Sequence, residues 1–155
     1  LFLILILVIA RMILPKELDD VHPLIPCEQE LIKKSDILWV IPLYQNKSIA
    51  DNKEFCDFLK SQDKIIGMHG VFHSWEEMKI PRSKEFILQG MGEFEKCIGY
   101  KPTLFKPSQM AIIKENLKPI NELGLKIRTP FSQLTHKAYH CNDTGFLSNK
   151  FNDLF

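Results

Sequence analysis

Two histidines four residues apart are the first chemical signal in this sequence. His69 and His73 stand in the segment HGVFHS. On a helical turn this spacing puts both imidazoles on one face, where together they can bind a metal ion. Gly70 occupies the position where a zinc-protease helix has its glutamate, so that kind of site is excluded. A pair of surface histidines often has no metal, so the motif needs support from elsewhere in the chain.

Adjacent carboxylates supply a second candidate. Asp19 and Asp20 stand in the segment ELDDVHP. Neighbouring side chains on an extended strand point in opposite directions, so one carboxylate can bind a metal while the other points to a water. A helix N-cap or a turn would also explain the pair, because both favour aspartate. His22 is within reach as a further ligand or a supporting group, or it is a turn residue fixed by Pro23.

A third polar cluster, 106–108, follows the short apolar run PTLF. All three clusters come directly after a predicted strand. The carboxyl ends of strands in α/β folds converge on one face, and that face holds the site. We therefore expect the three clusters to meet.

Short apolar runs alternate with helical stretches along the chain. The predicted strands are 12–18, 37–43, 64–68, 102–105 and 125–128, and the predicted helices are 28–34, 50–61, 83–98 and 108–123. In the helix 83–98, residues at i, i+4, i+7 and i+11 form one apolar stripe. This alternation predicts an α/β fold with parallel strands and helical crossovers. No regular element is predicted after Thr129.

Composition fits one globular domain and excludes several classes of protein. The chain has 155 residues, 45% of them hydrophobic and 25% charged, which suits a single core. The formal net charge is +1, so nothing favours nucleic acid as a partner. The sequence also lacks a Gly-x-Ser-x-Gly turn, a phosphate-binding glycine loop and a dinucleotide motif.

None of the four cysteines stands in a Cys-x-x-Cys pair, which excludes zinc-ribbon and redox motifs. Cys56 and Cys97 fall in apolar-periodic stretches, where we expect buried free thiols. The even count would permit disulfides in an oxidising compartment.

Taken together, the Asp pair and the later His-x-x-x-His resemble the polysaccharide deacetylase superfamily, also called carbohydrate esterases. The nearer resemblance is to a divergent branch whose first motif reads Leu-Asp-Asp-Val-His-Pro, here residues 18–23. His69, Gly70 and His73 match its second motif. The resemblance extends from Met12 to about Thr129 and implies an incomplete or distorted (β/α) barrel, because 155 residues are too few for a full one.

The resemblance implies a metal-dependent hydrolase that removes N- or O-linked acyl groups, such as acetyl, from a carbohydrate. It makes Asp20, His69 and His73 the ligands of one divalent ion and Asp19 the general base. Zinc suits these ligands, and nickel, cobalt or iron would also fit. A metal-binding pseudoenzyme of the same fold is the first alternative, and a structural α/β domain without metal is the second.

One part of the family pattern is altered, and another is matched in its letters. Lys106 stands where the family has the arginine of an Arg-Pro-Pro motif, and it either pairs with a carboxylate or is solvated. Leu134, Thr135 and His136 match a late Leu-x-His motif, which implies that His136 is the general acid. His140 competes for the same role.

Three aromatic residues are candidates for a sugar-binding cleft, because aromatic faces stack on sugar rings. They are Tyr44, Phe72 and Trp75. Core packing is the more common role of such side chains.

Residues 1–10 form an apolar run that ends at Arg11. The run is too short to span a bilayer, which needs roughly 20 residues. We interpret 1–11 as the remnant of a membrane anchor or signal segment and 12–155 as the deacetylase-like domain. This implies a membrane-anchored or extracytoplasmic protein. The alternative is a core strand or helix of the domain, and a core strand would allow a cytoplasmic protein.

Overall fold

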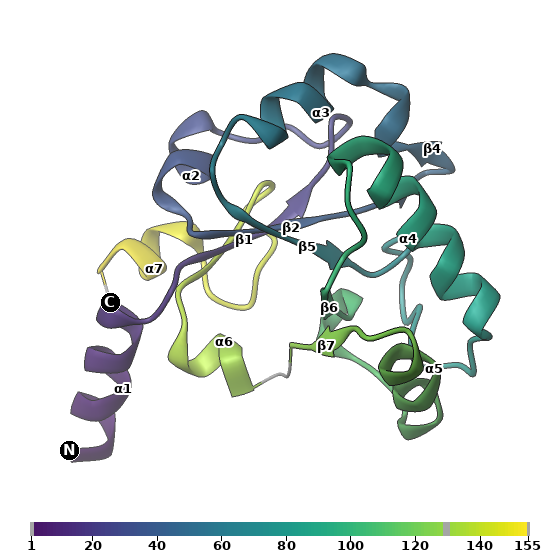
Figure 1. The fold of residues 1–155 in the computed structure, drawn as a ribbon. Coiled ribbons are helices and arrows are strands. Elements are labelled where there is room, and N and C mark those ends of the chain that lie inside the picture. The colour runs from purple at the N-terminus through teal and green to yellow at the C-terminus, as the bar shows by residue number, and fades with distance from the viewer. Residues whose placement is uncertain (1, 129–130, 155) are drawn as a thin grey trace.

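A sheet of six parallel strands runs through the centre of the molecule (Figure 1). The computed structural model describes residues 2–128 and 131–154. Along the sheet the strand order is β7-β6-β5-β2-β1-β8. The bounds are β1 Glu17–Val21, β2 Ile37–Val40, β5 Ile65–His69, β6 Leu104–Lys106, β7 Lys126–Ile127 and β8 Ala138–His140. β3 Leu43–Tyr44 and β4 Lys47–Ser48 form a separate antiparallel pair.

Helices surround this sheet, with α2 and α3 above it and α6 below it in Figure 1. The α-helices are α1 Phe2–Ile13, α2 Gln29–Lys34, α3 Lys53–Lys60, α4 Lys84–Ile98, α5 Leu117–Glu122, α6 Phe131–Thr135 and α7 Asn149–Leu154. Three short 3-10 helices are η1 Ile49–Asp51, η2 Ser108–Met110 and η3 Lys114–Asn116.

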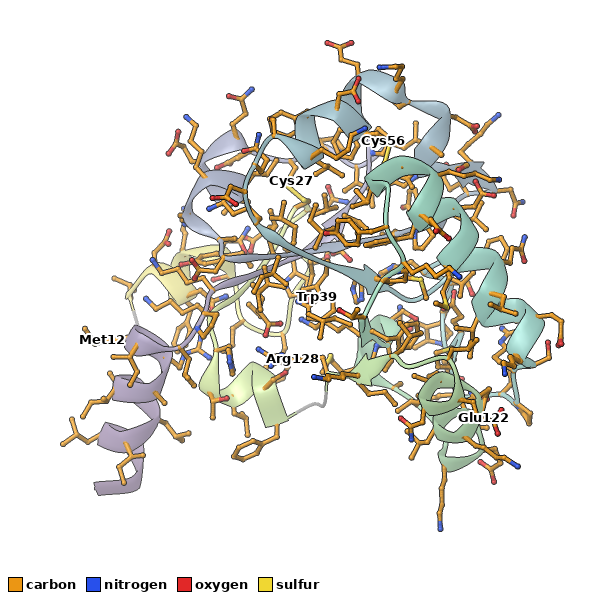
Figure 2. The ribbon with its side chains drawn as sticks, viewed as in Figure 1. Met12, Cys27, Trp39, Cys56, Glu122 and Arg128 are labelled. Atoms are coloured by element: carbon orange, nitrogen blue, oxygen red, sulfur yellow. A yellow bond between two sulfur atoms is a disulfide. The ribbon has the colours of Figure 1, made fainter. Side chains whose placement is uncertain are left out.

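The central strands are buried on both faces because helices cover the sheet. All four residues of β2 are buried, as expected of a continuous apolar run in a parallel sheet. Trp39 of β2 lies near the middle of the molecule in Figure 2. β5 makes room for it with Gly67, since a Cβ there would lie 2.4 Å from the indole ring.

The longest predicted helix, 83–98, is confirmed as α4. The hydroxyl of Ser83 caps its first turn by accepting the Phe86 N–H, and Gly99 ends it with φ 92°. The expected apolar stripe is buried: Ile87, Met91, Phe94 and Ile98. Gly90 lets the helix backbone approach Val71, in the loop after β5. In this way α4 supports the segment that carries His73.

Several sequence predictions were wrong. The strand expected at 12–18 is instead the end of α1 and the start of β1, so the Asp pair lies inside a strand. The helix expected at 108–123 is divided into η2, η3 and the short α5, and Pro119 lies in the first turn of α5, where it cannot continue a helix from the preceding residues. No element was expected after Thr129, yet α6, β8 and α7 form there. Their sequences are short and polar, and long-range contacts hold them in place.

The prediction of free thiols at Cys56 and Cys97 was also wrong. These two cysteines form a disulfide that joins α3 to α4, and Cys27 pairs with Cys141. Cys27 and Cys56 both lie above the sheet in Figure 2. Two disulfides indicate an oxidising, extracytoplasmic environment.

The N-terminal apolar run forms the helix α1, which crosses the boundary expected between residues 11 and 12. Its side chains Leu5, Ile6 and Ile9 are exposed, so it is not a core strand. Arg11 points inward and donates to the backbone oxygens of His136 and Leu134, at 2.8 and 3.3 Å. No described helix has both the length and the apolar character needed to cross a membrane.

Deletion of residues 1–10 should therefore change stability little. The truncation removes apolar side chains that are exposed or half-buried and keeps Arg11, which makes polar contacts with the domain. We expect a melting temperature within about 4 °C of the full chain. A thermal melt measures this, and Arg11→Met serves as the comparison. That substitution should lower the melting temperature more, because it leaves buried acceptors without a donor. Unfolding of the truncated chain at 25 °C would instead show that α1 is part of the core.

Candidate metal centre and catalytic site

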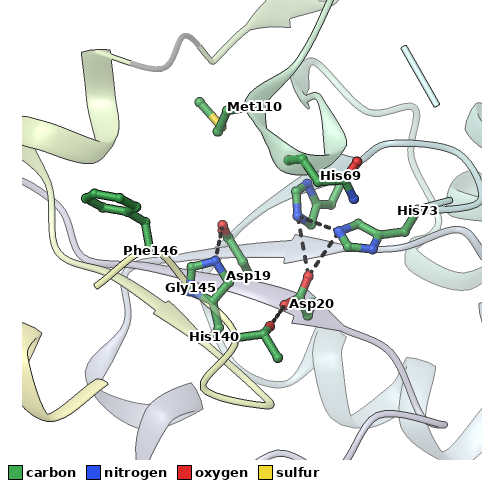
Figure 3. Close-up of a pocket in the computed structure, with 10 residues that line it drawn as sticks. Asp19, Asp20, His69, His73, Met110, His140, Gly145 and Phe146 are labelled. Carbon is green, nitrogen blue, oxygen red and sulfur yellow. Dashed lines mark hydrogen bonds and ion pairs between the residues drawn. The ribbon is translucent and has the colours of Figure 1, made fainter. Parts of the chain in front are cut away.

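Three ligand atoms from separate parts of the chain meet at the carboxyl ends of β1 and β5 (Figure 3). The Nε2 atoms of His69 and His73 lie 3.2 Å apart. Oδ1 of Asp20 lies 3.1 Å from Nε2 of His73 and 3.5 Å from Nε2 of His69. Asp20 and His69 are buried, and His73 is half-buried. The structure thus brings together the three residues predicted as metal ligands.

An unusual backbone conformation turns Asp20 toward the histidines. Asp20 has φ 64°, in the left-handed region, and the β1–β2 register shifts between Leu18 and Val21. Strict strand alternation would point Asp19 and Asp20 in opposite directions, but here both line one pocket. Aspartate is one of the few side chains that adopt this conformation readily.

A loop, not the expected helical turn, brings His73 back over His69. The buried carboxylate of Glu77 accepts the N–H groups of Val71 and Phe72, both at 2.7 Å. Gly70 has φ 61°, and a Cβ there would lie 2.7 Å from Oε1 of Glu77. The glycine and the glutamate therefore shape the turn between the two ligands.

The donor set fits a divalent metal ion. Nδ1 of His69 lies 3.1 Å from the Lys106 carbonyl, and a proton on Nδ1 leaves the lone pair of Nε2 directed at Asp20. Oδ1 of Asp20 is buried and has no hydrogen-bond donor besides the imidazoles among the described residues. Burial alone would raise the pKa of Asp20, but His69 and His73 hold it well below its ordinary value. Two imidazoles and a carboxylate are a ligand set of catalytic zinc sites.

Asp19 lies beside this cluster and is held from both sides. Its Oδ1 accepts from Nζ of Lys106 at 2.7 Å, and its Oδ2 lies 3.3 Å from Nε2 of His140. Strand pairing explains the second contact, because Asp19 in β1 is in register with His140 in β8. Lys106 is fully buried, so it pairs with carboxylates and is not solvated.

A second carboxylate, Glu17, shares Lys106 with Asp19. Nζ of Lys106 donates to Oε2 of Glu17 at 3.0 Å, and Trp39 donates to the same oxygen at 2.9 Å. Nε of Arg128 donates to Oε1 at 2.7 Å. Burial alone would raise the pKa of Glu17, but Lys106 and Arg128 lower it. Burial would lower the pKa of Lys106, but Asp19 and Glu17 raise it.

Neither Glu17 nor Arg128 was among the predicted site residues. Two signals in the sequence could have indicated them. Glu17 is a charged residue in a buried strand, and such a residue needs a partner. Arg128 is the last residue of a predicted strand, close to the strand ends that the other polar clusters follow.

The site opens into a pocket of about 350 Å³. The lining consists of Asp19, Asp20, His69, His73, Gln109, Met110, His140, Thr144, Gly145 and Phe146. His140 belongs to this lining, whereas His136 does not, and Nδ1 of His136 lies 3.0 Å from the Ser132 carbonyl. The structure therefore places His140, and not His136, beside Asp19.

The aromatic residues expected at a sugar cleft lie elsewhere. Phe72 packs against Phe86, Tyr44 lies beside the His22 ring, and Trp75 is exposed outside the pocket. His22 accepts the Leu24 N–H at Nδ1, as a turn residue does, and it is not part of the ligand cluster. Burial lowers the pKa of His22 to about 4. Phe146 and Met110, which the sequence did not indicate, line the pocket instead.

The chain is similar in fold to a solved deacetylase structure. The peptidoglycan N-acetylglucosamine deacetylase Bc1960, in complex with an N-oxidanyl-benzamide, matches with a TM-score of 0.55 and 15% identity. The match covers 72% of this chain and 54% of that chain. At this identity the likeness shows the fold alone. It confirms the expected class, an α/β fold with a parallel sheet that matches the distorted (β/α) barrel of deacetylases.

Two further structures match with lower TM-scores. The polysaccharide deacetylase Bc1974 from Bacillus cereus gives 0.45 at 18% identity, over 67% of this chain and 64% of that chain. BA3943, a CE4 family pseudoenzyme from Bacillus anthracis, gives a TM-score of 0.48 at 13% identity, over 60% of this chain and 32% of that chain. The chain thus spans about a third of the length of some proteins that it resembles. No family model and no curated protein sequence matches it.

Proposed function

We propose that this protein is a metal-dependent hydrolase that removes acyl groups, acetyl foremost, from a carbohydrate. The observation that carries the proposal is one pocket lined by both the Asp20, His69 and His73 cluster and the carboxylate of Asp19. A bound divalent ion, zinc in the first instance, would polarise the acyl carbonyl and make a water more acidic.

The residues around the cluster can move the protons of acyl hydrolysis. Lys106 holds the Asp19 side chain in the pocket by a hydrogen bond, and this carboxylate can take a proton from the attacking water as general base. His140 can give a proton to the departing sugar oxygen or nitrogen as general acid. We assign this role to His140 in place of His136, because only His140 lines the pocket. The products are a free carboxylic acid and the deacylated sugar.

A metal-binding protein without turnover is the second candidate. Both oxygens of Asp19 are already engaged, one by Lys106 and the other by His140, and this favours a carboxylate fixed in place over one that moves protons. The two candidates share the metal cluster, so only turnover separates them.

Membrane attachment through residues 1–11 remains part of the proposal. The exposed apolar side chains of α1 support it, and the two disulfides support a location outside the cytoplasm.

Acetate release tests the proposed function. The zinc-loaded protein is incubated with acetylated amino-sugar oligomers and with O-acetylated sugars, and free acetate is measured. We expect release that depends on added metal and stops when a chelator is added. Failure on every substrate, with the metal bound stoichiometrically, would favour the candidate without turnover.

The Asp19→Asn variant tests whether Asp19 is a general base or a metal ligand. Asparagine keeps the shape of the side chain but cannot take the proton, so the variant should bind one metal ion and lose at least about 100-fold in kcat. Metal analysis and acetate release on the same sample measure both properties. Loss of the metal in this variant would mean that Asp19 is itself a ligand.

A further inference from the structure

An aromatic side chain stands at the mouth of the pocket without a folding role. Phe146 is 93% exposed, more than any other large hydrophobic residue whose side chain the structure describes. It nevertheless lines the same pocket as Asp19 and His140. Figure 3 shows Phe146 and Met110 on the side of the pocket opposite His73. Exposure of an apolar ring to water is unfavourable, so its position at the mouth of a pocket indicates a ligand that covers it.

The loop that carries Phe146 is fixed at both ends. Cys141 is bonded to Cys27 at its start. At its end, Asn149 accepts the His140 N–H at 3.0 Å and donates to the His140 carbonyl at 2.8 Å. Within the loop, Gly145 packs against the His140 ring, since a Cβ there would lie 2.2 Å from Nδ1. The loop backbone that carries Phe146 is therefore tied to the strand of the proposed general acid.

A second observation concerns another part of the pocket rim, at η2. Gln109 and Met110 are consecutive residues with φ 49° and 53°, although neither is glycine. Such a conformation is unfavourable and persists where the surroundings impose it, which is common at ligand sites. Both side chains line the pocket. Oε1 of Gln109 accepts the Glu76 N–H at 3.0 Å, which fixes the amide and leaves its NH₂ group as a donor.

We propose that Phe146 is the sugar-binding platform of this site. The pyranose ring that bears the acyl group lies flat on the phenyl ring, with Met110 against its apolar edge and the Gln109 amide donating to a hydroxyl. This inference rests on the proposed function, because it takes a carbohydrate as the substrate. A sugar ring has an apolar C–H face and a polar rim, which matches an apolar wall flanked by one amide. The volume of about 350 Å³ suits one acylated sugar unit.

Binding of the N-acetylglucosamine tetramer tests the platform. Calorimetric titrations use the zinc-loaded Asp19→Asn protein, in which the sugar stays intact. Adding Phe146→Ala should weaken binding by roughly tenfold, because an aromatic contact and its apolar area are lost. Phe146→Tyr keeps the ring and should bind within about twofold of the parent. Trp75→Ala is the matched control, since Trp75 is 79% exposed but lies outside the pocket.

Kinetics in the background of native Asp19 give a second measurement. Phe146→Ala should raise KM for the tetramer by a similar factor and leave kcat within about threefold, because the ring holds the sugar and takes no part in proton transfer. A thermal melt should be unchanged, since the side chain is exposed.

The outcomes separate the platform from the hydrolase. Equal affinity of the Phe146→Ala and parent proteins, or no affinity of the parent protein for the tetramer, would overturn the platform. Tetramer binding that depends on Phe146, without acetate release from the protein with native Asp19, would support the platform and reject the hydrolase. Acetate release with a KM that is insensitive to Phe146 would support the hydrolase and reject the platform.

Discussion

Alanine at His69, His73 or Asp20 should abolish stoichiometric binding of a divalent metal ion. Each side chain supplies one of three converging atoms, and no fourth His, Cys, Asp or Glu among the described residues joins the group. Loss of a residue that only supports a ligand typically weakens metal binding by about 10- to 100-fold. Loss of a ligand itself should therefore weaken zinc binding by at least about 100-fold. Metal analysis after dialysis, followed by calorimetric titration with zinc, measures this effect.

The matched control for the metal prediction is His136→Ala. His136 lies outside the pocket, so this variant should keep one metal ion per chain. Zinc should also raise the melting temperature of the wild type and of His136→Ala, because a ligand that binds only the folded state stabilises it. Full metal occupancy in His69→Ala would rule out the assignment.

Lys106→Met should cause the largest loss of stability. Methionine fills a similar volume but leaves Glu17 and Asp19 without the buried cation that they share. Removal of one partner from a buried ion pair typically costs about 3–5 kcal/mol. Denaturation by urea should show this as a lower midpoint with a similar slope.

Lys33→Met is the control for a lysine in an ion pair at the surface. Lys33 pairs with Glu30, and both side chains are mostly exposed. The urea unfolding midpoint of the Lys33→Met variant should therefore equal that of the wild type within error. If the Lys106→Met substitution lowers the free energy of unfolding by less than about 1 kcal/mol, water or rearranged neighbours must replace the ammonium group in the buried cluster.

The residues of the ligand cluster could be predicted because their signals are local and because, in combination, they resemble the motifs of the deacetylase family, which also gave the choice of Asp20 over Asp19. His69 and His73 are four residues apart, Asp20 is half of an Asp pair, and both motifs follow apolar runs. The rule that the carboxyl ends of parallel strands converge then brings the motifs together. Burial on both faces also made β2 recognisable, because such a strand is a continuous apolar run.

The remaining parts of the site depend on contacts that no local pattern records. Glu17 meets Lys106 and Arg128 across 89 and 111 residues of sequence. β8 has three residues and forms because it pairs with β1 and because Asn152 donates to the Ala138 carbonyl. A segment of three residues gives no periodicity to read, so His140 could not be preferred to His136 from the sequence.

The disulfide between Cys27 and Cys141 has a consequence for the timing of biosynthesis. Its cysteines are 114 residues apart, so the bond cannot form until nearly the whole described domain has been synthesised. β8 is bound by the same constraint, because it pairs with β1 from the far end of the chain. The ligand cluster of Asp20, His69 and His73 is complete much earlier. A nascent chain could thus assemble this cluster before His140 reaches Asp19, and the role that we propose for His140 would require residues 138–141 and the disulfide to be in place.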